Sequence, residues 1–237
     1  LLSVLLLVAF VQIEQRSRDP LMQFALLRLP GLRAALGLTF AFMSSYGVQY
    51  YFMALYFQDG YGWSPLQAGL AFLPATAVCT VGIQLAEWTL QRWSARKVLV
   101  IGQLAGAIGI AWVAATLPHG ANFWPLLPGV VVLSIGQGMT WTSMWIVAGQ
   151  GVPSAQQGVA SGMAATAQQI SGALGLAVLV MVANADAGTA GSPSALAGLV
   201  RAEYGAALFS LFGVVIALGL RPAPAESAAT VCPANEA

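Results

Sequence analysis

Charged residues are scarce in this sequence. Asp, Glu, Lys and Arg make up 7% of the 237 residues, whereas an ordinary soluble domain carries about a quarter. So few charges do not supply a water-exposed surface, which excludes an ordinary soluble globular domain. The formal net charge of +1 provides no basic field that would attract a polyanion, and we expect no nucleic-acid partner.

The residue types that most often carry redox chemistry, metal binding or catalysis are also few. Cys79 and Cys232 are too few for a disulfide framework and have no metal-ligand spacing. A zinc protease of the HExxH type needs two histidines, and His119 is the single histidine. An intramembrane serine protease would need the motif Gly-x-Ser-Gly. Here Val159 takes the place of the motif's first glycine, two positions before Ser161. We therefore expect no enzyme, no cofactor and no metal site.

Long apolar blocks take the place of the missing charges. Each is close to the roughly 20 residues that an α-helix needs to cross about 30 Å of hydrocarbon. The predicted fold is an all-α integral membrane protein with six complete transmembrane helices plus the end of a seventh. The six spans are expected at about 34–57, 65–88, 98–117, 123–149, 158–183 and 196–220.

The remaining segments have other predicted roles. Residues 1–13 lack an initiator Met, a basic n-region and a cleavage site, so they are interpreted as the end of a truncated transmembrane helix and not as a signal peptide. Residues 14–33, with several arginines and two prolines, are expected to form a cytoplasmic amphipathic linker to a six-helix bundle at 34–220. Residues 221–237 are expected to form a disordered cytoplasmic tail.

The cations are distributed unevenly over the two sides that alternating spans would create. Of the 9 Lys and Arg residues, one side receives only Arg201. The positive-inside rule makes the other side cytoplasmic, which predicts a multi-pass protein of the cell (plasma or inner) membrane, embedded in the lipid bilayer, with a cytoplasmic C-terminus. The cytoplasmic cations would be Arg16, Arg18, Arg28, Arg33, Arg92, Arg96, Lys97 and Arg221.

Three stretches carry a family resemblance. The first is LYFQ at 55–58 with GWSPLQAGL at 62–70 and FLP at 72–74, the second is LPG at 127–129 with GQG at 136–138, and the third is GVASG at 158–162 with QQISGALG at 168–175. These stretches resemble the major facilitator superfamily, specifically its 14-helix drug:H+ antiporter-2 group of QacA/EmrB-type multidrug exporters. They correspond to the region after its ninth helix and to its twelfth and thirteenth helices.

The resemblance implies that the chain is the C-terminal half of a transporter, containing helices nine to fourteen. Such transporters have two bundles that rock about a central site, giving alternating access. The missing N-terminal bundle would then be a partner, together with protons and a small hydrophobic or cationic substrate. The family's gate loop is altered here, because Glu87, Gln91 and Ser94 replace its glycine, acid and second glycine. The predicted cytoplasmic gate consists of Glu87, Arg92, Arg96 and Lys97.

The acidic residues are expected to lie away from the middle of the membrane. Glu87 is assigned to the cytoplasmic end of its span, and Asp59, Asp186 and Glu203 are assigned to external loops or their vicinity. An ionisable side chain at mid-membrane is costly and by default suggests a function. Since no such residue is expected here, the proton-coupling carboxylate is presumed to lie in the missing N-terminal half.

Two faces with helical spacing are candidates for substrate binding. The first span carries Phe42, Tyr46, Gln49, Met53 and Tyr56, and the fourth carries Ser134, Gln137, Trp141 and Met144. Aromatic and methionine side chains provide polarizable surface that attracts cations and can repack around different ligands. The alternative is that each face packs against a neighbouring helix. The predicted substrate-binding residues are Phe42, Tyr46, Gln49, Met53, Gln137 and Trp141.

Small residues recur on two other spans. They are expected to form faces where helix backbones approach closely: Gly102, Gly106 and Gly109 on the third span, and Gly158, Gly162, Gly172 and Gly175 on the fifth. The predicted function is the C-terminal half of a proton-coupled multidrug or small-molecule efflux transporter. The alternative is a truncated remnant that does not transport.

Overall fold

The computed structural model describes residues 12, 30–119, 123–149, 156–185 and 193–220. Nearly all of the expected truncated helix at 1–13, most of the linker at 14–33 and the whole tail at 221–237 lie outside the described residues.

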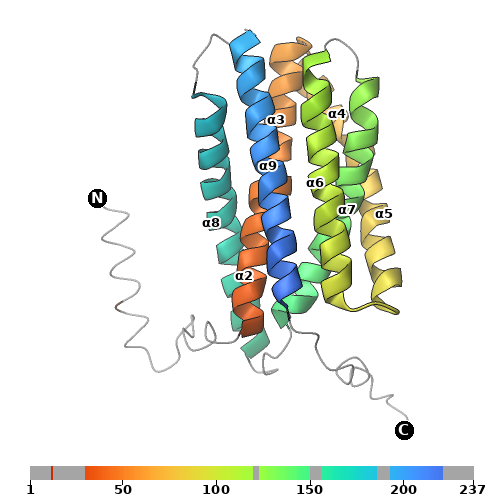
Figure 1. The fold of residues 1–237 in the computed structure, drawn as a ribbon, viewed down its shortest axis with the longest axis vertical. Coiled ribbons are helices and arrows are strands. Elements are labelled where there is room, and N and C mark those ends of the chain that lie inside the picture. Colours follow the sequence, from red (N-terminus) through yellow and green to blue (C-terminus); the bar gives the residue numbers. More distant parts are fainter. Residues whose placement is uncertain (1–11, 13–29, 120–122, 150–155, 186–192, 221–237) are drawn as a thin grey trace.

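The described residues form helices and the turns between them, without a strand (Figure 1). This confirms the all-α class. In chain order the elements are α2 (Pro30–Phe42), η2 (Met43–Gly47), α3 (Gln49–Leu55), η3 (Tyr56–Gly60), α4 (Pro65–Leu70), α5 (Phe72–Leu90), α6 (Ala95–Thr116), η4 (Leu117–His119), η5 (Trp124–Leu126), α7 (Leu127–Gly149), α8 (Gln157–Ala183) and α9 (Pro193–Gly219).

The predicted count of six complete spans is corrected by the structure. Within the described residues, five helical stretches are long and apolar enough to cross a membrane: Pro65–Leu90, Ala95–Thr116, Trp124–Gly149, Gln157–Ala183 and Pro193–Gly219. The stretch expected as a first span, 34–57, is instead divided into α2 and α3 by the π-helical segment η2. Such wide turns interrupt the regular helical repeat and often occur at functional sites.

Local sequence explains where the helical stretch Pro65–Leu90 begins. The Ser64 hydroxyl accepts a hydrogen bond from the Gln67 backbone N–H, and the Gln67 side chain accepts one from the Ser64 backbone N–H. This capping box satisfies two backbone donors that a helix start leaves unpaired. Pro65 occupies the first helical position, where its missing N–H costs nothing.

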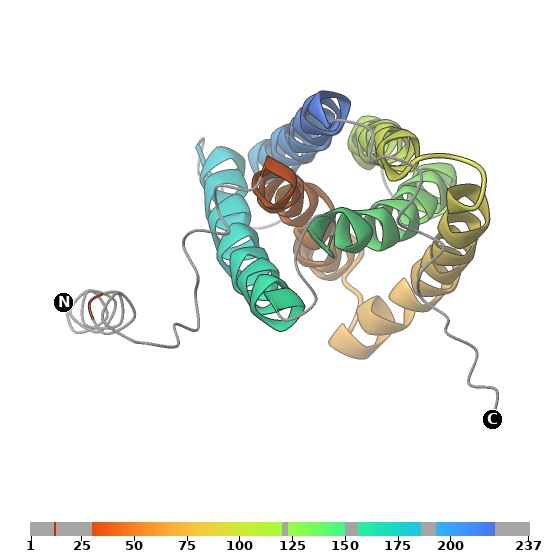
Figure 2. The ribbon, with the colours of Figure 1, turned by 90° about the horizontal axis from the view of Figure 1, so that it is seen from below.

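Helix α6 packs between α7 and α9, whereas α2 lies nearer the middle of the bundle, in contact with α7, α8 and α9 (Figure 2). We call the contact between α6 and α7 the glycine seam, defined by Gly102, Gly106, Gly109, Gly129 and Gly136. A Cβ atom added to Gly136 would lie 2.6 Å from the Gly102 carbonyl oxygen, and one added to Gly109 would lie 2.7 Å from that of Gly129. Only glycine allows this backbone approach. The expected packing role of Gly102, Gly106 and Gly109 is confirmed.

The expectation for Gly158 and Gly162 is wrong for the described part of the chain. A Cβ atom added to either residue would meet no described atom within 4 Å. Further along α8 the expectation is confirmed for Gly175, which packs against Ser44 of η2, and a Cβ atom added to Gly172 would lie 3.2 Å from the end of the Met43 side chain. The first half of α8 contacts the bundle through larger side chains, since Met163 is buried against Leu32 of α2.

The outer surface of the bundle is apolar. Large hydrophobic side chains such as Leu66, Ile108, Met181 and Val215 are more than half exposed. The helices at the margins are the most open, since 11% of the most apolar part of Pro65–Leu90 is buried, against 56% for Ala95–Thr116. An apolar outer surface, with polar side chains such as Gln49 and Gln103 buried inside the bundle, suits a surrounding of lipid, and the chain is a multi-pass membrane protein.

Candidate functional site

A cavity lies between α3, the start of α5 and α7. Its volume is about 40 Å³, which is room for on the order of three water molecules. Gln49, Ser134 and Gln137 contribute its polar groups. The rest of the lining is Tyr50, Met53, Phe57, Ala71, Phe72, Ala75, Phe123, Val130 and Leu133.

The two predicted amides approach this cavity from different helices. Gln49 begins α3 immediately after the π-helical segment, and Gln137 lies near the middle of α7. The Gln137 Nε2 atom lies 3.5 Å from the Tyr50 hydroxyl, to which it donates a long hydrogen bond. The structure thus brings Gln49, Met53 and Gln137 together around one cavity.

Three aromatic rings of the cavity lining belong to a larger cluster. We call Phe57, Tyr61, Trp63, Phe72 and Phe123 the aromatic cluster, of which Phe57, Phe72 and Phe123 line the cavity. Phe57 contacts the other four rings, with ring centroids 5.1 Å from Trp63 and 5.8 Å from Phe123. The lining rings supply an apolar surface with cation-attracting π-systems.

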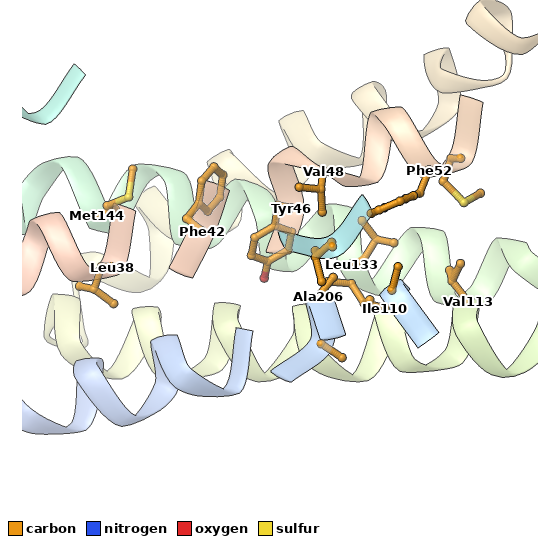
Figure 3. Packing of buried hydrophobic residues seen from close by; sticks show 14 of the residues in the cluster. Leu38, Phe42, Tyr46, Val48, Phe52, Ile110, Val113, Leu133, Met144 and Ala206 are labelled. Carbon is orange, nitrogen blue, oxygen red and sulfur yellow. The ribbon is translucent and has the colours of Figure 1, made fainter. Parts of the chain in front are cut away.

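The other predicted substrate-binding residues lie outside the lining of this cavity. Tyr46 is fully buried, and its hydroxyl donates to the Gly102 carbonyl oxygen at 2.7 Å. Phe42 is 5.6 Å from the Trp141 ring and 5.0 Å from the Tyr46 ring, measured between centroids. Figure 3 shows Phe42 and Tyr46 within the packed interior, with the Tyr46 hydroxyl directed toward α6.

Gln49 has a second neighbour that sequence analysis did not predict. Its Nε2 atom donates to Glu203 Oε2 at 2.8 Å and lies 3.4 Å from the Ser45 carbonyl oxygen. Glu203 has no exposed surface and Gln49 is 5% exposed. The amide therefore lies between the cavity on one side and a buried carboxyl group on the other.

The position of Glu203 corrects the expectation that no acid lies at mid-membrane. Its helix α9 begins at Pro193 and has 27 residues, so at 1.5 Å per residue it is about 40 Å long. Glu203 is about 4.5 Å along the axis from the helix midpoint at Ala206. The expectation that Glu203 lies in or near an external loop was wrong, because α9 begins at Pro193 and extends ten residues before the acid.

The predicted gate residues lie at the turn between α5 and α6. Glu87, Arg92 and Lys97 are exposed and Arg96 is half-buried. Within the described residues Glu87 and Arg92 do not form an ion pair, and the Arg92 guanidinium lies 4.9 Å from the centre of the Trp88 ring. A role for these four residues in gating remains a prediction.

Several residues of the site were missed for identifiable reasons. Tyr50 belongs to the expected first span but not to its predicted substrate-binding face. Phe72 was considered only as part of the family motif FLP at 72–74. Glu203 was detectable, since it is the single carboxylate in the apolar block expected at 196–220.

Within the described residues, no group of three or more His, Cys, Asp or Glu side chains is placed to hold a metal ion.

Comparison with known proteins adds a family to this geometry. The family model described as Major Facilitator Superfamily matches residues 2–176. The cephamycin export protein CmcT of Amycolatopsis lactamdurans is 34% identical over 221 residues, which cover 92% of this chain and 44% of that protein. The puromycin resistance protein pur8 of Streptomyces alboniger is 31% identical, covering 91% of this chain and 44% of that protein.

A third relative has a similar name. The tetracenomycin C resistance and export protein of Streptomyces glaucescens is 29% identical over 75% of this chain and 33% of its own length. The chain thus spans less than half the length of the curated relatives it matches. A helical membrane bundle, a family model that covers most of the sequence and these relatives lead to one conclusion. The chain belongs to the Major Facilitator Superfamily.

Proposed function

We propose that this chain forms one wall of the central cavity of an efflux transporter for small hydrophobic or cationic compounds. The transporter exchanges its substrate for protons and works by alternating access between two helix bundles. The three relatives, named for antibiotic export or resistance, support the direction of transport and the class of substrate.

The observation that carries this proposal is the cavity between Gln49 and Gln137. Gln49 Nε2 donates to Glu203 and Gln137 Nε2 to Tyr50, but Gln49 Oε1 is buried without a hydrogen-bond partner among the described residues. An unpartnered polar atom in a membrane is expensive, which supports water or a ligand in the cavity that both amides line. Met53 and the aromatic cluster provide a polarizable surface around them. Apolar walls with a few convergent polar groups are typical of small-molecule sites.

The size of the cavity supports a shared site. Pockets for drug-sized ligands have volumes of about 300–1,000 Å³, whereas this one has about 40 Å³. A substrate therefore needs either an outward movement of α3 or a second wall facing α7. We propose that an opposing N-terminal bundle supplies this wall.

The orientation of the chain in the membrane is part of the proposal. The turn between α5 and α6, with Arg92, Arg96 and Lys97, lies in the cytoplasm together with the C-terminal tail. Labelling of Cys232 in sealed cells tests this orientation. An impermeant thiol reagent should leave Cys232 unmodified until the cells are opened, and labelling from outside would contradict it.

Transport can be tested by joining this chain to the N-terminal half of the cephamycin export protein. The intact relative serves as the positive control, and this chain expressed alone is the second comparison. We expect the joined protein to accumulate cephamycin inside everted vesicles, where export from the cytoplasmic face becomes uptake, and we expect this uptake to be lost when an uncoupler removes the proton gradient. If the joined protein reaches the membrane in normal amounts without efflux, the non-transporting remnant is the better description.

A further inference from the structure

We propose that Glu203 is a proton-binding carboxyl group at mid-membrane, with Gln49 as its hydrogen-bond partner and its link to the cavity. This deepens the proposed function, on which its role in transport rests. The proton is the ligand, and the site lies within this bundle and not in an opposing one.

The first step concerns the three side-chain oxygens of Gln49 and Glu203. Gln49 Nε2 donates to Glu203 Oε2. The other two oxygens, Gln49 Oε1 and Glu203 Oε1, are buried and have no hydrogen-bond partner among the described residues. These two unpartnered oxygens can only accept hydrogen bonds while Glu203 is ionised. A proton on Glu203 Oε1 gives this side of the pair a donor. Buried polar groups are rarely left unpaired, so this imbalance favours the protonated acid.

The second step concerns charge. Removing an ionised carboxylate from water costs far more than removing a neutral acid, unless a cation compensates it. The amide of Gln49 offers one hydrogen bond and no positive charge. An ionisable group inside a membrane span that has no counter-ion suits a proton relay better than a packing role.

The surrounding elements supply no such cation to the Glu203 carboxylate. Arg33 at the start of α2 and Arg96 and Lys97 at the start of α6 are about 20 Å away along the helix axes. Arg201 precedes Glu203 by two positions, which places it about 200° around α9, on the exposed side. Helix α8 contributes no titratable residue. The remaining titratable side chains on the segment from α2 to η3 and on α9 are Tyr46, Tyr50, Tyr51, Tyr56, Tyr204 and the exposed Asp59.

Those neighbours are engaged elsewhere or point outward. Tyr46 donates to the Gly102 carbonyl oxygen and Tyr56 to that of Leu117. Tyr50, Tyr51 and Tyr204 are each more than 40% exposed. The described hydrogen bonds of Glu203 thus come from Gln49, and the protonation state of the acid depends on that amide and on water or charge arriving through the cavity.

This arrangement couples proton release to the cavity. When Glu203 loses its proton to water, the O–H bond breaks and the carboxylate keeps the electron pair. The new negative charge is stabilised when water or a cationic substrate reaches Gln49 from the cavity. Binding of a proton reverses this step and favours the closed pair seen here.

Infrared difference spectroscopy of the full chain in lipid nanodiscs tests the site without any transport. The carbonyl stretch of a protonated carboxyl group should be present near neutral pH and disappear as the pH is raised. Glu203→Gln should remove this band, since the amide keeps the shape and hydrogen-bonding capacity without a titrating proton. Gln49→Leu should shift its frequency, because the acid loses its partner.

Asp59→Asn is the matched control. It makes the same carboxyl-to-amide change at an exposed residue of η3, and the band should be unaffected. Circular dichroism of each variant reports whether the helices are intact. A band that persists in folded Glu203→Gln, or a wild-type chain without such a band at any pH from 5 to 9, overturns the proposal.

The experiment also separates this proposal from the proposed function. If the chain shows the Glu203 band but gives no efflux when it is joined to an N-terminal bundle, that result supports the proton site and contradicts the proposed transport. Proton-driven efflux by a protein without the band, or undiminished in Glu203→Gln, supports the transporter and contradicts the site.

Discussion

Gly136 and Gln137 are adjacent on α7 but face two different surroundings. Gly136 lies in the glycine seam, where a Cβ atom would come within 2.8 Å of the Gly106 backbone nitrogen. Gln137, about 100° further around the helix, lines the cavity. One helix thus carries a contact that tolerates no added atom beside a surface that has unfilled space.

The comparison shows how rigidity and adaptability are divided within the bundle. Backbone-to-backbone contact in the glycine seam fixes α6 against α7, because no side chain is available there to repack. The cavity is lined in part by long, flexible side chains such as Met53 and Gln137, which change rotamer more easily than a backbone contact can shift. Substrates of different shape can then be accommodated without moving the seam.

The largest effect is expected from filling the seam with Gly136→Leu. The new side chain would collide with the backbone of α6 and with the Tyr46 hydroxyl, so we expect a destabilisation of about 3 kcal/mol or more. The measurement is the amount of folded protein that is monodisperse in detergent.

Gly162→Leu is the control for that change, since a Cβ atom there meets no described atom within 4 Å. The amount of folded protein should match the wild type. Equal amounts for both variants would show that the seam is not the rigid part of the bundle.

A smaller effect, confined to function, is expected from Gln137→Leu. The substitution removes one polar group from the cavity and leaves the seam unchanged, so membrane abundance should stay near that of the wild type. In the joined transporter we expect several-fold changes in the relative export of cationic and neutral compounds. Unchanged export of both classes at normal abundance would show that this face only packs.

The fold was largely predictable from composition and block length. Few charges and long apolar blocks leave helices in lipid as the available solution, and glycines at 102, 106 and 109 indicate a close helix contact. The interruption at η2 was not predictable, because nothing in the sequence MSSYG of Met43–Gly47 distinguishes a π-helical turn from a regular α-helical one. A π-helical turn depends on tertiary packing, here of Tyr46 against α6 and of Ser44 against α8.

The π-helical turn η2 also explains why only some residues of the candidate site were predicted correctly. Helical spacing placed Phe42, Tyr46, Gln49 and Met53 on one face. After a wide turn, the residues that follow are rotated relative to those before it, so Gln49 and Met53 reach the cavity while Tyr46 reaches α6. Glu203 was missed for a different reason. The span expected at 196–220 contained it, but its place near the expected start suggested the vicinity of an external loop, whereas α9 begins at Pro193 and Glu203 lies near the middle of the helix.

Tyr46→Phe distinguishes the two surroundings at a residue that spacing assigned to the cavity. The structure places its hydroxyl on the Gly102 carbonyl oxygen at 2.7 Å, so its loss should destabilise the folded chain by about 1 kcal/mol. The range of exported compounds should not change. Thermal unfolding and export profiles are the two measurements, and an altered profile with unchanged stability would return Tyr46 to the substrate site.

The smallest effect is expected from exchanging one methionine for leucine in each surrounding. Met53 lines the cavity, whereas Met144 is 2% exposed in the interior, where its sulfur accepts a hydrogen bond from the Thr39 hydroxyl at 3.4 Å. Leucine has a similar volume, so each exchange should cost less than about 1.5 kcal/mol. Leucine is branched and has fewer rotamers than methionine, which makes the lining of the cavity less adaptable.

Met53→Leu should therefore alter the relative export of compounds of different shape by about twofold, with stability close to that of the wild type. Met144→Leu should leave the export profile unchanged and lower stability slightly. Paired export and unfolding measurements on the two variants make the comparison. Because both variants have the same change in side-chain volume, a difference between them reports the surroundings, and identical results would mean that the cavity is packed as firmly as the interior.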